Sequence, residues 1–158
     1  MKITAHIAQH LLDVYTGGNW TEVSVADALA GLSYTQASTV TAASPNSIAA
    51  IVHHLAYWNK VMISRIGGEN PIVPEANGFD VGSLGNDVEW KKLIREMLVS
   101  ASELAVATRD VPEETLELPI VAGGSSTYKN LQGSVEHVHY HLGQIVIIKK
   151  LLTGSSTF

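Results

Sequence analysis

The chain has 158 residues, 46% of them hydrophobic, and a formal net charge of −5, which predicts a single globular domain over residues 1–158. Lys and Arg are scattered, without the basic stripe that follows nucleic-acid phosphates or the basic amphipathic helix that lies on a membrane. Cysteine is absent, which excludes disulfides and thiolate metal sites. We therefore expect neither nucleic acid nor membrane as a partner.

The first predicted helix runs from about Ile3 to Tyr15, because apolar residues recur on one side of it and Gly17-Gly18 follows. The next long helix is predicted to begin with Ser44 as its N-cap and Pro45 at its first position. Its helical periodicity continues to Ile66. A short helix over 25–32 is expected between these two.

The third long helix is predicted from Asp87, a plausible cap, to about Arg109. The fourth is predicted from about Thr127 to about Leu152. Residues 116–121 form the one stretch expected to be briefly extended, and no strand pattern is strong enough to build a sheet. The predicted fold is therefore all-α, with four main helices.

The connection over residues 67–86 is long, with Pro71, Pro74 and several glycines. Neighbouring antiparallel helices need only a short turn, so a linker of this length predicts a crossover at the end of the bundle.

No stretch reaches the ~18 uninterrupted apolar residues that a membrane-spanning helix needs. His6, Gln9 and His10 interrupt any apolar signal sequence near the N-terminus, and no small-residue cleavage site follows. We expect a cytoplasmic protein.

Three histidines carry the strongest chemical signal. His137 and His141 are spaced i, i+4, which places both imidazoles on one face of the fourth predicted helix. His54 lies near the middle of the second long helix, so all three rings can meet at one height in the bundle. A core histidine is the ordinary alternative for each, but three imidazoles without nearby acidic partners are costly to bury. We predict one metal ion bound by His54, His137 and His141.

Two other histidines are expected to point elsewhere, because each is sequence-adjacent or close to a ligand and lies on a different side of its helix. For His53 and His139 we predict a surface position or a supporting contact behind the ligands. Glu136 and His139 form an E-x-x-H pair, but a di-iron centre needs a second such pair and two further carboxylates. No phosphate-binding loop or nucleophile elbow is present either.

With these residues in hand, the chain resembles the DinB-like superfamily, which includes the YfiT-like proteins described as metal-dependent hydrolases. The resemblance depends on His54-Leu55 with Trp58 one turn later, and on His137-x-x-Tyr140-His141-x-Gly143-Gln144 near the C-terminus. It implies an up-down-down-up four-helix bundle with the long crossover between its second and third helices. It also implies one divalent ion, zinc or nickel, on the three histidines, in a homodimer.

Several relatives in that superfamily are thiol S-transferases that use bacillithiol, mycothiol or glutathione. Three nitrogen ligands leave a divalent ion with an open position, which favours chemistry on a small-molecule substrate. We predict transfer of a low-molecular-weight thiol to a small electrophile. A metal-dependent hydrolase and a non-catalytic, metal-stapled binding bundle remain open alternatives. Gln144 projects onto the ligand face and is the one candidate catalytic residue: it either orients a ligand or touches the substrate, with a core amide as the ordinary alternative.

Overall fold

The computed structural model describes residues 2–154 and contains four long helices and three short ones. The long helices confirm the all-α prediction, and the described residues form no strand, only two isolated bridges. In chain order the helices are α1 (Ile3–Thr16), α2 (Val25–Leu29), α3 (Tyr34–Ser38), α4 (Ile48–Ile66), α5 (Asp87–Asp110), the 3-10 turn η1 (Glu113–Thr115) and α6 (Thr127–Thr153).

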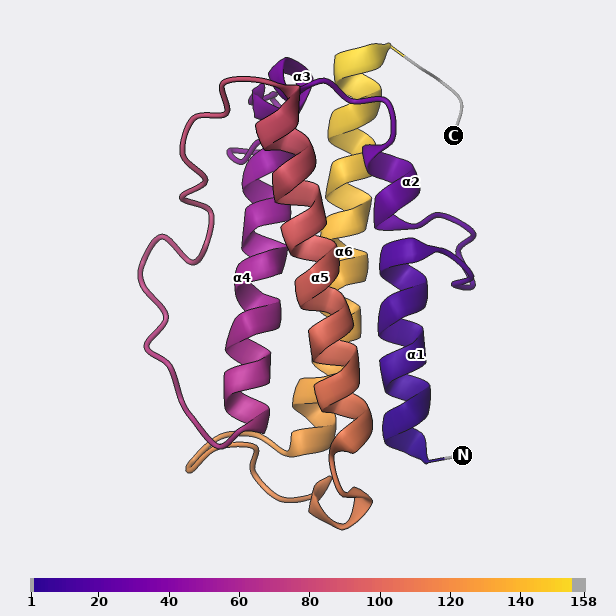
Figure 1. Cartoon of the computed structure of the whole chain (residues 1–158), viewed down its shortest axis with the longest axis vertical. Helices are drawn as coiled ribbons and strands as arrows, with labels where there is room; N and C mark the ends of the chain where they lie inside the picture. Colours follow the sequence, from indigo (N-terminus) through magenta and orange to yellow (C-terminus); the bar gives the residue numbers. More distant parts are fainter. Residues whose placement is uncertain (1, 155–158) are drawn as a thin grey trace.

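The four long helices lie side by side (Figure 1). α5 packs against both α4 and α1. α6 also packs against α4 and α1. In the view of Figure 1, α1 and α6 rise while α4 and α5 descend, so α4 and α5 run parallel. The segment 67–86 therefore cannot simply cross the end of the bundle, as predicted; it returns along the length of α4, on the outer side of that helix.

The predicted start of α4 and the predicted cap of α5 are wrong, whereas α5 begins at Asp87 as predicted. α4 begins three residues late, with Ser47 as its cap, accepting a hydrogen bond from the Ala50 N–H at 3.2 Å. Ser44 is used in a preceding turn instead, where its hydroxyl accepts from the Asn46 N–H. α5 begins at Asp87 as a helical residue, because the cap is Asn86, which accepts from two backbone N–H groups.

The short helix predicted over 25–32 ends at Leu29, and α3 follows as a second short helix that was not predicted. Both begin with a capping box, formed by Ser24 with Asp27 and by Ser33 with Gln36. A serine followed three residues later by an acid or amide is a readable signal for each start.

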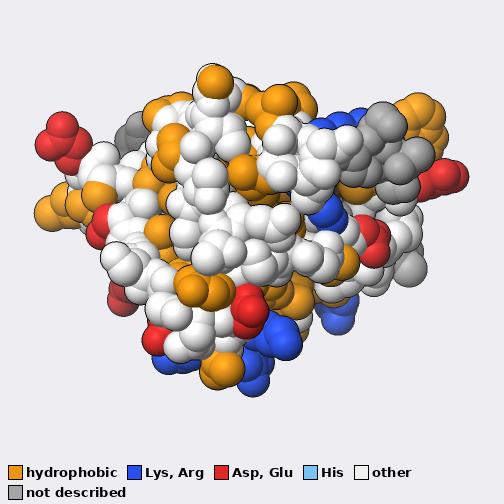
Figure 2. Space-filling view, turned by 90° about the horizontal axis from the view of Figure 1, so that it is seen from above, with side chains coloured by type: hydrophobic (Ala, Val, Ile, Leu, Met, Phe, Trp, Pro, Cys, Tyr) orange, Lys and Arg blue, Asp and Glu red, His pale blue; other side chains and the backbone are white. Residues whose placement is uncertain are grey.

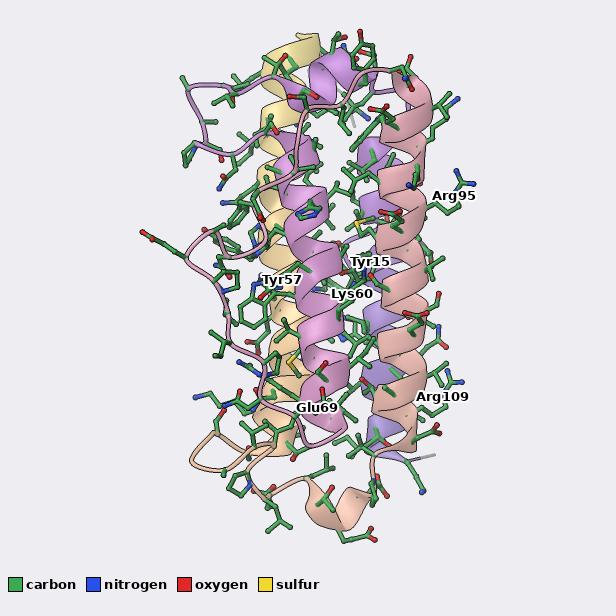
Figure 3. The ribbon with its side chains drawn as sticks, turned by 60° about the vertical axis from the view of Figure 1, so that its left-hand side comes forward. Tyr15, Tyr57, Lys60, Glu69, Arg95 and Arg109 are labelled. Carbon is green, nitrogen blue, oxygen red and sulfur yellow. The ribbon has the colours of Figure 1, made fainter. Side chains whose placement is uncertain are left out.

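A small network of buried hydrogen bonds lies among the apolar side chains of the core. The Tyr15 hydroxyl hydrogen-bonds the Asn59 side chain, and the Asn59 amide donates to the Ser100 hydroxyl at 3.0 Å. These residues come from α1, α4 and α5, and Figure 3 shows Tyr15 directed into the bundle. Burial raises the pKa of Tyr15 well above its usual range, so the hydroxyl stays protonated and the contact ties three helices together.

The surface is mixed in charge. Figure 2 shows acidic and basic side chains interspersed at one end of the bundle, with no broad field of one sign. Between residues 2 and 154, no helix combines the length and apolar character needed to cross a membrane.

Candidate metal centre

His54 projects from the middle of α4 into the bundle and is only 3% exposed. Its Nδ1 lies 2.6 Å from the backbone oxygen of Asn77 in the crossover segment. A carbonyl oxygen only accepts hydrogen bonds, so Nδ1 carries the proton and donates it. The Nε2 atom of His54 is therefore left with a free lone pair.

His137 and His141 stand one turn apart on α6, as their spacing predicted. The Nδ1 of His141 lies 2.7 Å from the Gln144 Oε1, and the Gln144 amide nitrogen donates to the Tyr140 hydroxyl at 3.2 Å. This chain of contacts assigns the proton of His141 to Nδ1 and again frees Nε2. Gln144 therefore lies behind a candidate ligand, where it orients the ring.

The three rings converge on one point through their Nε2 atoms. The Nε2 of His137 lies 2.9 Å from that of His54 and 3.1 Å from that of His141, and the candidate ligand atoms all lie within 4.8 Å of one another. The Nε2 atoms of His54 and His141 both have free lone pairs. A proton on the Nε2 of His137 could be donated to only one of them. A cation between the three nitrogens satisfies all three, so the cluster fits, and could hold, a metal ion.

The electrostatics of the cluster also favour neutral imidazoles. Burial, followed by the neighbouring imidazoles, lowers the pKa of His137 to about 3. Burial also lowers the pKa of His141 to about 4 and that of His54 below its usual value. Neutral rings with free lone pairs are the form in which histidine binds metals.

The crossover segment supplies contacts that sequence reasoning missed. Phe79 stacks on the His54 ring with centroids 3.9 Å apart, and the Asn77 side-chain oxygen accepts from the Trp58 indole N–H at 2.9 Å. His53 reaches the same segment, with its Nδ1 2.7 Å from the Gly78 oxygen. His53 therefore contacts the crossover segment and not a candidate ligand. The Asn77-Gly78 pair is a turn signal that could have indicated a tight bend here.

Gly78 is expected to be indispensable for this bend. Its φ is +76°, and a Cβ at this position would lie 2.7 Å from the Cβ and Cγ of Tyr57. Figure 3 shows Tyr57 between α4 and the crossover segment. Gly78→Ala should cost about 2 kcal/mol or more through left-handed backbone strain and overpacking, lowering the melting temperature by roughly 4–8 °C.

Gly82→Ala is the matched control in a thermal melt, because Gly82 has no positive φ and nothing lies within 4 Å of its added Cβ. Equal melting temperatures for the two variants would contradict the packing described for Gly78.

The remaining predicted residues lie away from the convergence point. His139 contacts the Val135 backbone oxygen and lies beside His10 of α1, with ring centroids 5.5 Å apart. Glu136 is exposed on α6, so the E-x-x-H pair does not face the cluster. Trp58, one turn after His54, is partly buried and lines a cavity next to the histidines.

That cavity lies between α4 and α6 and has a volume of about 680 Å³. His54, His137 and His141 form part of its wall, with Trp58 and Phe79 as aromatic neighbours. This volume falls in the range of sites that take small organic molecules. The cluster is thus buried in the bundle yet adjoins a space for a ligand.

Fold and site together define a class of protein, the all-α bundles with a three-histidine cluster that could hold a metal ion. The chain belongs to the DinB superfamily, to which residues 19–145 match in a comparison with known families. The match includes all three histidines and confirms the resemblance seen in their motifs. Searches of curated proteins and of solved structures found no match.

Proposed function

We propose that the protein is a divalent-metal-dependent enzyme that transfers a low-molecular-weight thiol to a small electrophile. His54, His137 and His141 would hold one zinc or nickel ion. The observation that carries the proposal is the convergence of three Nε2 atoms at the wall of a 680 Å³ cavity. Membership of the DinB superfamily is consistent with it. A homodimer stays a prediction.

The donor set favours a catalytic site over a structural one. In the described part of the chain, no fourth His, Asp or Glu joins the three-histidine group, and the sequence has no cysteine. A divalent ion on three neutral imidazoles keeps a position for an external ligand and favours the thiolate form of a bound thiol at neutral pH. With no thiol of its own, the chain would need an external one.

The surrounding residues have separate roles in this proposal. The Asn77 backbone oxygen and Gln144 hold two imidazoles in the tautomer with a free Nε2. Trp58 and Phe79 provide apolar walls that keep water away from the sulfur and the electrophile. Transfer forms one S–C bond while the bond from that carbon to its leaving group breaks, and the proton of the thiol goes to solvent or to the leaving group.

Cobalt-substituted protein tests the proposal directly. Glutathione, bacillithiol and mycothiol should be titrated in turn, and at least one should produce an intense near-ultraviolet charge-transfer band at millimolar concentration. S-methylglutathione is a matched control for glutathione, because it keeps the peptide but has no ionisable sulfur. The thiol that binds should then react faster with a small electrophile in the presence of metal-loaded protein than of chelated protein.

Absence of a new band with every thiol would contradict the transferase proposal. The metal-dependent hydrolase would then become the better candidate, because water can use the same open position. A band without any acceleration of S–C bond formation would instead favour a thiol-binding bundle without catalysis.

A further inference from the structure

The end of the cavity away from the histidines is positively charged. Arg65 and Lys129 line it, whereas no Asp or Glu does so among the described residues. The chain as a whole has 15 acidic and 10 basic residues. A cavity lined by two cations and by no described acid therefore differs in charge from the chain as a whole. A hollow lined by one sign of charge attracts small ions of the opposite sign.

Arg65 is the better defined of the two cations. It lies in the last turn of α4, with its Cζ 5.4 Å from the centroid of the Trp58 ring. Its Nε is buried and has no hydrogen-bond partner among residues 2–154, and no carboxylate in that range lies within ion-pair distance of its guanidinium. A buried donor without a partner costs about 1–3 kcal/mol, and no described carboxylate offsets the charge of this guanidinium, whose residue lines the cavity.

The same indole adjoins the histidine cluster. The Trp58 ring lies 6.0 Å from the His137 ring and 6.3 Å from the His54 ring, centroid to centroid. One small molecule lying against Trp58 can therefore reach both the guanidinium and the three imidazoles. Ser125, Lys129 and Asn130, at the start of α6, complete the charged end of the cavity, where the partial positive charge of the helix N-terminus adds to that of Lys129.

We infer that Arg65, assisted by Lys129, binds a carboxylate group of the small molecule whose reactive atom lies at the three-histidine cluster. A guanidinium presents a planar fork of donors that matches a carboxylate, and packing against an indole leaves its edge free. The inference rests on the proposed function only in placing the reactive atom at the histidines. It assigns the substrate class as a small carboxylic acid.

The test compares two thiols of equal size, 3-sulfanylpropanoate and its amide, which differ in one negative charge. Their dissociation constants for cobalt-substituted protein come from the charge-transfer band. The acid should bind about tenfold more tightly than the amide, and Arg65→Gln should lower this ratio by a factor of about five or more, with Lys129 keeping the remainder. Because ratios are compared between variants, intrinsic differences between the two thiols cancel.

Two further variants separate charge from structure. Lys60→Gln removes a cation from the exposed side of α4, outside the cavity, and should leave the ratio unchanged (Lys60 is labelled in Figure 3). Arg65→Lys keeps the positive charge but lacks the two parallel donors of a guanidinium, so it should retain part of the preference for the acid over the amide. A melting temperature for each variant shows whether the fold is intact.

A second measurement keeps this inference distinct from the thiol proposal. Calorimetric titration with succinate and with succinamide, which contain no sulfur, should show a preference for the acid that Arg65→Gln reduces. Such a result, with no thiol band, would support the carboxylate site and contradict the transferase. An unchanged acid preference in Arg65→Gln, by both measurements, would overturn the carboxylate site and leave the thiol proposal standing.

Discussion

Replacing any one of His54, His137 or His141 by alanine is expected to reduce bound divalent metal from about one ion per chain to a small fraction of that. Each ring contributes one Nε2. The Nε2 atoms of His54 and His141 lie 2.9 Å and 3.1 Å from that of His137. Loss of a group that merely orients a ligand typically costs 10–100-fold in metal affinity, so loss of a ligand should cost at least about 100-fold. Elemental analysis after dialysis measures the result.

His139→Ala is the matched control, since His139 lies on the same helix, two residues from both candidate ligands, and faces His10 instead of the cluster. His53→Ala should also keep its metal, because the His53 ring contacts the Gly78 oxygen. Full metal retention in any of the three ligand variants would show that the cluster is a group of buried core histidines.

Acidification is expected to destabilise the protein in a window set by the same three histidines. Burial lowers the pKa of His137 to about 3 and that of His141 to about 4, and it lowers the pKa of His54 as well. An unfolded histidine titrates near 6.5, so between about pH 6.5 and 4 the unfolded chain binds more protons than the folded one. The stability these groups contribute is present above pH 6.5 and is lost as pH falls towards the folded pKa values.

The expected slope is at most about 1.4 kcal/mol per pH unit for each histidine. Metal that binds only the folded state adds to stability, by about 2.7 kcal/mol at a hundredfold excess over its dissociation constant. Thermal melts at pH 7.5 and pH 5, each with and without chelator, separate the two effects. His137→Gln, which removes the most strongly shifted group, should flatten the pH dependence. Identical melting temperatures under all four conditions would contradict both the burial of neutral histidines and the coupling of metal to fold.

Local patterns in the sequence account for the four long helices and for the placement of His137 and His141 on one face. The i, i+4 spacing of His137 and His141 places them on one face of a helix whatever surrounds it, because the helical repeat is 3.6 residues. The length of segment 67–86 similarly indicated a crossover, since a tight antiparallel turn would have needed only a few residues. The start of α4 was misplaced because Ser44 and Ser47 are equally good caps in isolation, and the cap of α5 was misassigned because Asn86 and Asp87 are too.

Only the tertiary structure decided how the site is completed. The Asn77 backbone oxygen holds the His54 tautomer, and every residue has such an oxygen, so no residue type identified it in advance. Arg65 lies seven residues after Trp58 on α4, so helical spacing alone places the two on one face, whereas Phe79 comes to the cavity from the crossover segment at a separation that follows no helical or strand period. Contacts of this kind depend on how α4, α6 and segment 67–86 pack together, because side chains distant in sequence are brought together by burial of the shared core and not by the local backbone repeat.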